Sequence, residues 1–108
     1  MRQAKVFYKN ILAGIITEND EGYTFEYDES YLKYSESKPV SLTLPLKSGY
    51  YQNKMLFPFF DGLIPEGWLL NIALNNWKIN PRDRFGLLLT LCKDCVGCVS
   101  VVPKENES

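Results

Sequence analysis

Apolar and polar residues alternate in three short runs at the start of the chain, as they do in half-buried β-strands. These runs cover residues 4–8, 11–17 and 23–27. Lys9-Asn10 and Asn19–Gly22, which separate them, are rich in turn-forming residues. The pattern predicts a three-stranded meander in which Tyr23, Phe25 and Tyr27 share one face. Gly14, inside the second run, indicates a bulge or a close backbone approach.

The middle of the chain predicts one helical turn and a fourth strand. Asp28 can cap a turn that passes through Tyr31 and Leu32. Alternation then returns over residues 40–46, which would place on one side of a strand Val40, Leu42, Leu44 and Leu46. Pro45 cannot donate to a ladder, so this strand should end or lie at an edge there. Residues 47–54 are polar, and we expect them to form a mobile link.

Two helices and a last strand are predicted in the remaining part. One helix should begin near Pro65 or Glu66 and end at about Trp77. The second should begin at Asn80, with Pro81 in its first turn and Asp83 reaching back as in a capping box, and end at about Leu91. Its apolar residues surround the helix, so it should be buried. Residues 96–102 are rich in valine, and we expect them to form the last strand.

Together these elements predict an α+β fold, a small antiparallel, partly barrel-like sheet of about five strands packed by two helices. With 108 residues, the chain is expected to form one domain over residues 1–103, followed by a polar tail at 104–108.

Composition excludes several classes of function. The net charge is −1 and the basic residues are scattered, which argues against direct nucleic-acid binding. No segment is apolar and long enough for a membrane span or a signal peptide, so a cytoplasmic location is expected. Histidine is absent, which removes the commonest general base and many metal sites. We expect no catalytic residue and no cofactor.

The three cysteines, Cys92, Cys95 and Cys98, have a spacing that suggests a metal site. A tetrahedral site needs four ligands, and the chain has neither a fourth cysteine nor a histidine. Neighbouring valines make buried structural thiols the better interpretation, with no bound metal.

The segment from Leu56 to Leu70 combines aromatic residues with proline, glycine and acidic residues. Asp61 and Glu66 could form a catalytic carboxylate pair. We favour structural roles, a loop turn for Asp61 and a first-turn position in a helix for Glu66. On a helical projection Trp77 lies within the apolar arc, whereas Trp68 lies about 20° from Asn75 on the polar edge. An exposed tryptophan is a candidate binding anchor.

With these motifs in place, the chain resembles the N-terminal subdomain of HipA-type serine/threonine kinases, the toxins of bacterial toxin–antitoxin systems. The resemblance covers nearly the whole chain and rests on four segments, residues 40–46 (VSLTLPL), 57–69 (FPFFDGLIPEGWL), 80–89 (NPRDRFGLLL) and 93–99 (KDCVGCV). Cys92 and Cys98 occupy places where that family tends to have Gly and Ala, a departure that affects packing only.

The resemblance implies an accessory part of a kinase without the kinase itself, since no Gly-rich phosphate loop or catalytic H-R-D run occurs in the chain. In the tripartite HipBST-like systems, a separate HipS-like antitoxin binds and silences a HipT-like kinase, with a HipB-like DNA-binding protein as third member. The alternative is a structural piece of a single-chain HipA kinase, inert alone. The resemblance also places the segment after Leu56 against a kinase, with these expected partner-binding residues: Phe59, Asp61, Ile64, Glu66, Trp68 and Asn71.

Overall fold

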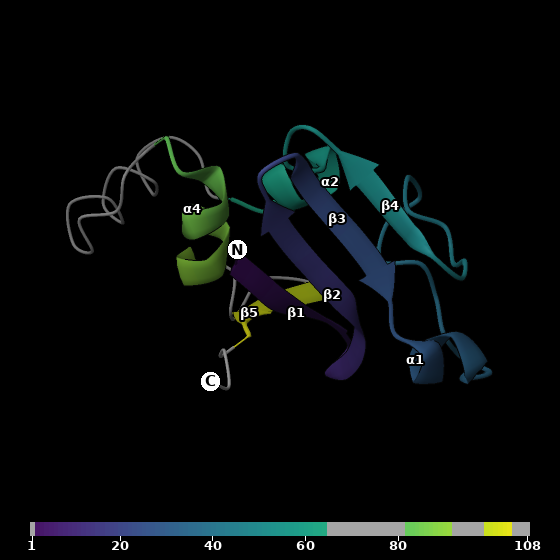
Figure 1. Cartoon of the computed structure of the whole chain (residues 1–108). Helices are drawn as coiled ribbons and strands as arrows, with labels where there is room; N and C mark the ends of the chain where they lie inside the picture. Colours follow the sequence, from purple (N-terminus) through teal and green to yellow (C-terminus); the bar gives the residue numbers. More distant parts are fainter. Residues whose placement is uncertain (1, 65–81, 92–98, 105–108) are drawn as a thin grey trace.

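The computed structural model describes residues 2–64, 82–91 and 99–104. Its strands are β1 (Arg2–Tyr8), β2 (Ile11–Asn19), β3 (Gly22–Tyr27), β4 (Tyr50–Asn53) and β5 (Val99–Pro103). Its helices are α1 (Glu29–Lys33), α2 (Pro58–Asp61) and α4 (Arg84–Leu91). The strands form one antiparallel sheet in the order β4-β3-β2-β1-β5. The α+β prediction is therefore confirmed, with an open sheet that ends at β4 and β5 (Figure 1).

The predicted meander is present. Lys9 and Asn10 adopt positive φ values of 50° and 67°, which suit a two-residue hairpin turn. β1 and β2 pair from Arg2↔Glu18 onwards, and the register shifts after the pair Val6↔Gly14. A Cβ on Gly14 would lie 2.3 Å from the Glu26 carbonyl oxygen, so this position requires glycine. Both the bulge and the close approach predicted there are found.

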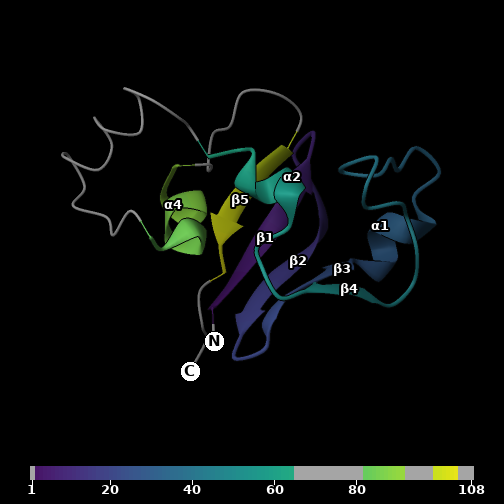
Figure 2. The ribbon, with the colours of Figure 1, turned by 90° about the horizontal axis from the view of Figure 1, so that it is seen from above.

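One face of the sheet carries the core. Phe25 and Tyr27 of β3 are buried, as the alternation predicts, and Phe25 packs 5.5 Å from the ring of Phe60 in α2. Among the described residues, the largest fully buried side chains are Phe25, Phe60, Phe85, Ile16, Leu87, Leu88, Val6 and Val101. Helix α4 lies near β5, and α1 lies at the opposite end of the molecule in both views (Figures 1 and 2).

The predicted cap of α1 is present, whereas α4 begins later than predicted. The Asp28 side chain accepts a hydrogen bond from the Tyr31 N–H at the start of α1. In α4 the Asp83 carbonyl accepts from Leu87 N–H, and the Asp83 carboxylate accepts from Gly86 N–H at 3.1 Å. Asp83 is therefore the N-cap of α4 rather than a residue of its first turn.

Residues 40–46 do not form the predicted strand. Leu44 N–H donates to the Ser41 carbonyl at 3.1 Å, which closes a turn, and an isolated bridge joins the same two residues. Val40 and Leu44 are buried, but Leu42 is 96% exposed, so the side chains do not share one side. The adjacent prediction is also wrong, because Tyr50–Asn53, expected in a mobile link, pair with β3 as an edge strand.

Other predictions lie outside the described residues. These are the helix from about residue 65 to 77, the three cysteines and the first part of the last strand. The described part of that strand, Val99–Pro103, is present and pairs with β1 at one edge of the sheet.

Candidate partner-binding surface

The segment from Phe57 to Ile64 is a series of tight turns around α2. Pro58 occupies the first turn, where its missing N–H costs nothing. Asp61 N–H donates to the Phe57 carbonyl at 3.0 Å, and Gly62 N–H donates to the Pro58 carbonyl at 2.9 Å. The aromatic residues fix the segment on the sheet, since Phe57 and Phe60 are buried. The turns leave the other side of α2 at the surface.

Asp61 and Arg84 form a salt bridge on this surface. The Arg84 Nε atom lies 2.7 Å from Asp61 Oδ1, and the two side chains are 37% and 43% exposed. The pair joins the end of α2 to the first residue of α4. Pairs as exposed as this contribute about 0–1 kcal/mol to folding.

A shallow groove of about 650 Å³ runs beside this salt bridge. It is lined by Tyr23, Asn53, Lys54, Met55, Leu56, Pro58, Asp61 and Arg84. Met55 adds an apolar side chain that is 75% exposed. An apolar groove with a charged rim has the anatomy of a protein-interaction surface. We call this groove, together with Phe59, the α2 surface.

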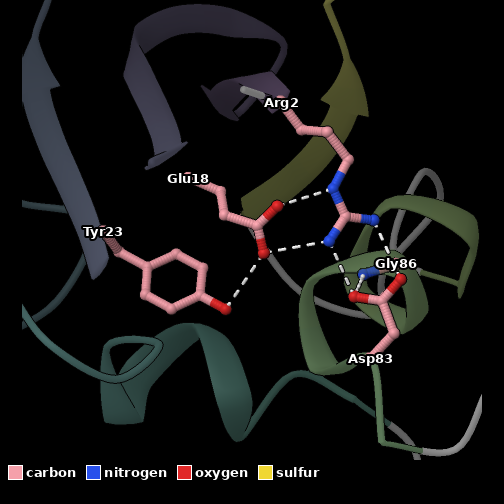
Figure 3. Close-up of polar contacts among 5 residues, drawn as sticks. All are labelled: Arg2, Glu18, Tyr23, Asp83 and Gly86. Atoms are coloured by element: carbon pink, nitrogen blue, oxygen red, sulfur yellow. Dashed lines mark hydrogen bonds and ion pairs between the residues drawn. The ribbon is translucent and has the colours of Figure 1, made fainter. Parts of the chain in front are cut away.

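A second polar cluster, centred on Arg2, joins α4 to the sheet (Figure 3). The Arg2 guanidinium donates to both carboxylate oxygens of Glu18 at 2.7 and 2.9 Å, and to both of Asp83 at 2.9 and 2.7 Å. The Tyr23 hydroxyl donates to Glu18 at 3.3 Å, so the cluster also reaches the lining of the groove. Arg2 lies 5.3 Å from the centre of the Phe85 ring.

This geometry shifts three pKa values, of which that of Arg2 is raised by its hydrogen bonds to Asp83 and Glu18. The hydrogen bonds from Arg2 hold the pKa of the Asp83 carboxyl below its ordinary value, with help from the Gly86 N–H. Burial raises the pKa of Tyr23, and the nearby Glu18 carboxylate adds to the effect. Asp83 therefore stays ionised at neutral pH, where it serves both as the cap of α4 and as the partner of Arg2.

The structure brings together part of the predicted partner-binding set. Asp61 lies on the α2 surface, and Phe59 is half-buried with its ring 5.2 Å from that of Phe60. Ile64 is only 3% exposed and packs in the core, so it offers little surface to a partner. Glu66, Trp68 and Asn71 lie outside the described residues.

Sequence reasoning missed Arg84 and Met55. Arg84 pairs with Asp61 across 23 positions, and no local spacing indicates such a contact. Met55 lies between the predicted polar link, residues 47–54, and the segment that begins at Leu56, so neither prediction included it. Within residues 2–64, 82–91 and 99–104, no group of three or more metal-ligating side chains is found, and no helix is long and apolar enough to cross a membrane.

The open sheet, its three described helices and this surface define a small α+β domain. The profile of one family, the HipA N-terminal domain, matches residues 4–102. A Haemophilus influenzae protein of uncharacterised function is 31% identical over 98% of this chain and 96% of its own length. The chain belongs to the HipA N-terminal domain family.

Other relatives are much longer. Two Sinorhizobium fredii proteins named as candidate kinases, Y4mE and Y4dM, are 27% and 32% identical over 99% and 85% of this chain. The matched part is 26% and 24% of their lengths.

Solved structures show the same fold. The N-terminal domain of HipA toxin matches with a TM-score of 0.77 and 28% identity, over 99% of this chain and 96% of that one. The fold is also similar to part of the Shewanella oneidensis complex of HipA, HipB and operator DNA. There the TM-score is 0.71 at 17% identity, over 95% of this chain and 24% of the matched chain.

Proposed function

We propose that this chain is a non-enzymatic antitoxin that binds a HipT-like serine/threonine kinase toxin and holds it in an inactive state. The main support for the proposal is the share of each relative's length that aligns with this chain. The Haemophilus influenzae relative aligns over 96% of its length, whereas the candidate kinases Y4mE and Y4dM align over about a quarter of theirs. A domain that is built into some family members and makes up nearly all of another can be supplied to a kinase as a separate chain.

The α2 surface is the contact surface in this proposal. Asp61 and Arg84 present a matched pair of charges beside the apolar groove and the exposed Met55. Charges at the rim of an interface select the partner, while apolar groups at its centre provide most of the affinity. Glu66, Trp68 and Asn71 follow α2 in the chain, and the helical projection assigns Trp68 as the anchor, with the two polar residues at its rim.

A HipB-like DNA-binding protein is the expected third member of the complex. The support is the fold similarity to HipA in a structure that contains HipB and its operator DNA. This chain is proposed to contact the kinase and not the DNA, because its basic residues form no continuous stripe and its net charge is −1.

The second candidate is an N-terminal subdomain of a single-chain HipA kinase, inert alone. The matches to Y4mE and Y4dM favour it. The mass of the native protein distinguishes the two, because a subdomain would be found covalently linked to a kinase.

Growth rescue in bacteria tests the proposed function. The HipT-like kinase of the same genome is expressed with and without this chain, and colony formation is counted. Rescue by the chain supports the proposal, whereas unchanged toxicity at equal kinase levels contradicts it.

A charge exchange tests the surface. Asp61→Arg and Arg84→Asp should each weaken rescue, and the double variant restores the salt bridge within the chain. If the two charges face the kinase, the double variant melts like wild type but still fails to rescue. If they serve only to join α2 and α4, the double variant rescues fully.

A further inference from the structure

Leu42 is the most exposed of the large apolar side chains described, at 96%. It stands at the tip of the turn from Val40 to Pro45, which we call the Leu42 turn. Its two apolar neighbours in the turn, Val40 and Leu44, are 5% and 3% exposed and enter the core. The turn thus directs one leucine outwards while the residues on either side of it anchor the backbone.

Tyrosine hydroxyls form hydrogen bonds with the backbone of this turn. The Tyr27 hydroxyl accepts from the Val40 N–H at 3.0 Å and donates to the Leu44 carbonyl, so it joins both ends of the turn. Tyr27 is 3% exposed, and burial raises its pKa to about 12, which keeps the hydroxyl protonated and able to donate. The ring of Tyr31 stacks on that of Tyr27 at 6.1 Å.

The same support extends to the residues on either side. The Tyr31 hydroxyl accepts from Lys38 N–H at 3.0 Å and donates to the Lys38 carbonyl at 2.6 Å. The Tyr51 hydroxyl donates to the Pro45 carbonyl at 2.6 Å. Within the turn, Ser41 Oγ accepts from Thr43 N–H at 3.2 Å. Three tyrosine hydroxyls therefore anchor the backbone on both sides of Leu42.

A side chain that is 96% exposed contributes almost nothing to the core, so the fold does not explain a leucine at this tip. A turn that hydrogen bonds already hold loses less conformational entropy when its apolar side chain binds a partner. The turn carries no charge between Pro39 and Leu46, which matches the charge depletion found at interface centres. The exposed Lys38 and Lys47 flank it in sequence.

We propose that Leu42 is a second anchor, which enters an apolar pocket with an acidic rim on the HipT-like kinase. This inference rests on the proposed function and adds a second contact to the one at the α2 surface. The apolar side chain defines the pocket, and the two flanking lysines define the charge of its rim. The uncharged hydroxyl groups of Ser41 and Thr43 can complete the contact without a desolvated charge.

Binding of the purified kinase to Leu42→Ser tests the inference. The matched control is Ile11→Ser, since Ile11 is also an exposed apolar residue, at 41%, but lies in the β1–β2 hairpin. Leu42→Ser should melt like wild type and weaken binding by about tenfold or more, whereas Ile11→Ser should bind within about twofold of wild type. Exchanging Lys38 and Lys47 together for glutamate should slow association and reverse its dependence on salt.

The outcomes separate the two proposals. If wild type binds the kinase and Leu42→Ser binds equally well, the anchor is overturned and the antitoxin function stands. If the wild-type chain does not bind the kinase at all, both are overturned. Weaker binding by Leu42→Ser with unchanged melting and an unaffected Ile11→Ser control supports the anchor.

Discussion

The Arg2 guanidinium and the Asp83 carboxylate meet at 2.7 Å although 81 positions separate them in the chain. Arg2 opens β1, and Asp83 caps α4, which also carries Arg84 of the α2 surface. This pair of side chains therefore helps to position α4 against the sheet, together with the buried side chains of Phe85, Leu87 and Leu88. Arg2 also donates to both carboxylate oxygens of Glu18 in β2, so its guanidinium binds two carboxylates, each through two hydrogen bonds.

Replacement of Asp83 should destabilise the domain. Asp83→Ala removes the cap of α4 and one partner of Arg2, and should lower the free energy of unfolding by about 1–2 kcal/mol. Asp83→Asn keeps an oxygen for the Gly86 N–H and should lose less. Urea denaturation of the three proteins at pH 7 measures both differences. Equal losses in the two variants would show that capping contributes little here.

The lowered pKa of the Asp83 carboxyl predicts that the stability of the domain falls at acidic pH. The hydrogen bonds from Arg2 lower the pKa of Asp83 in the folded state, so its contribution is fully present above the pKa of the unfolded chain, about 4. This contribution to stability is lost as the pH falls through the lowered pKa that Asp83 has in the folded state. The stability difference between wild type and Asp83→Asn should therefore shrink on acidification below pH ~4. A difference that stays constant to pH 2 would contradict the assigned ion pair.

Tyr27→Phe should loosen the Leu42 turn. The variant keeps the buried ring but leaves Val40 N–H and the Leu44 carbonyl without the hydroxyl that joins them, a loss of about 1–3 kcal/mol. Tyr34→Phe is the control, because the Tyr34 hydroxyl bonds only the exposed Glu36 carboxylate, and its loss should cost less than about 0.5 kcal/mol. Thermal melting compares the two. Equal melting temperatures would mean that the Tyr27 hydroxyl does not hold the turn.

The two tryptophans should behave differently. The helical projection places Trp77 in the apolar arc and Trp68 at the polar edge, so Trp77→Ala should destabilise the domain by about 3–5 kcal/mol. Trp68→Ala should leave the melting temperature unchanged and weaken neutralisation of the kinase. Early melting of Trp68→Ala, or full neutralisation by it, would remove Trp68 as the anchor.

The meander could be predicted from sequence because its information is local. Alternation sets the face of each strand, and turn residues such as Lys9-Asn10 set the hairpins. Residues 40–46 also alternate, but there the partner that decides the structure is the Tyr27 hydroxyl, which lies 13 positions from Val40. β4 lacks an apolar alternation and exists because β3 offers it an edge, which no local pattern reveals.

The surface was predictable only in part for the same reason. Phe59 and Asp61 stand in a segment whose composition is unusual by itself. The residue that pairs with Asp61, Arg84, becomes its neighbour only when α4 is placed on the sheet. Ile64 stands in the same segment but is buried in the core, where its N–H closes the turn that follows α2 by donating to the Asp61 carbonyl.

Direct inhibition of the kinase tests the central claim. The purified HipT-like kinase of the same genome is assayed for phosphotransfer while this chain is titrated from zero to a molar excess, with Ile11→Ser as a control outside the α2 surface and the Leu42 turn. We expect the wild-type chain and the control each to abolish phosphotransfer at about one chain per kinase, and neither to show phosphotransfer alone. Full kinase activity at saturating amounts of the folded chain would contradict it.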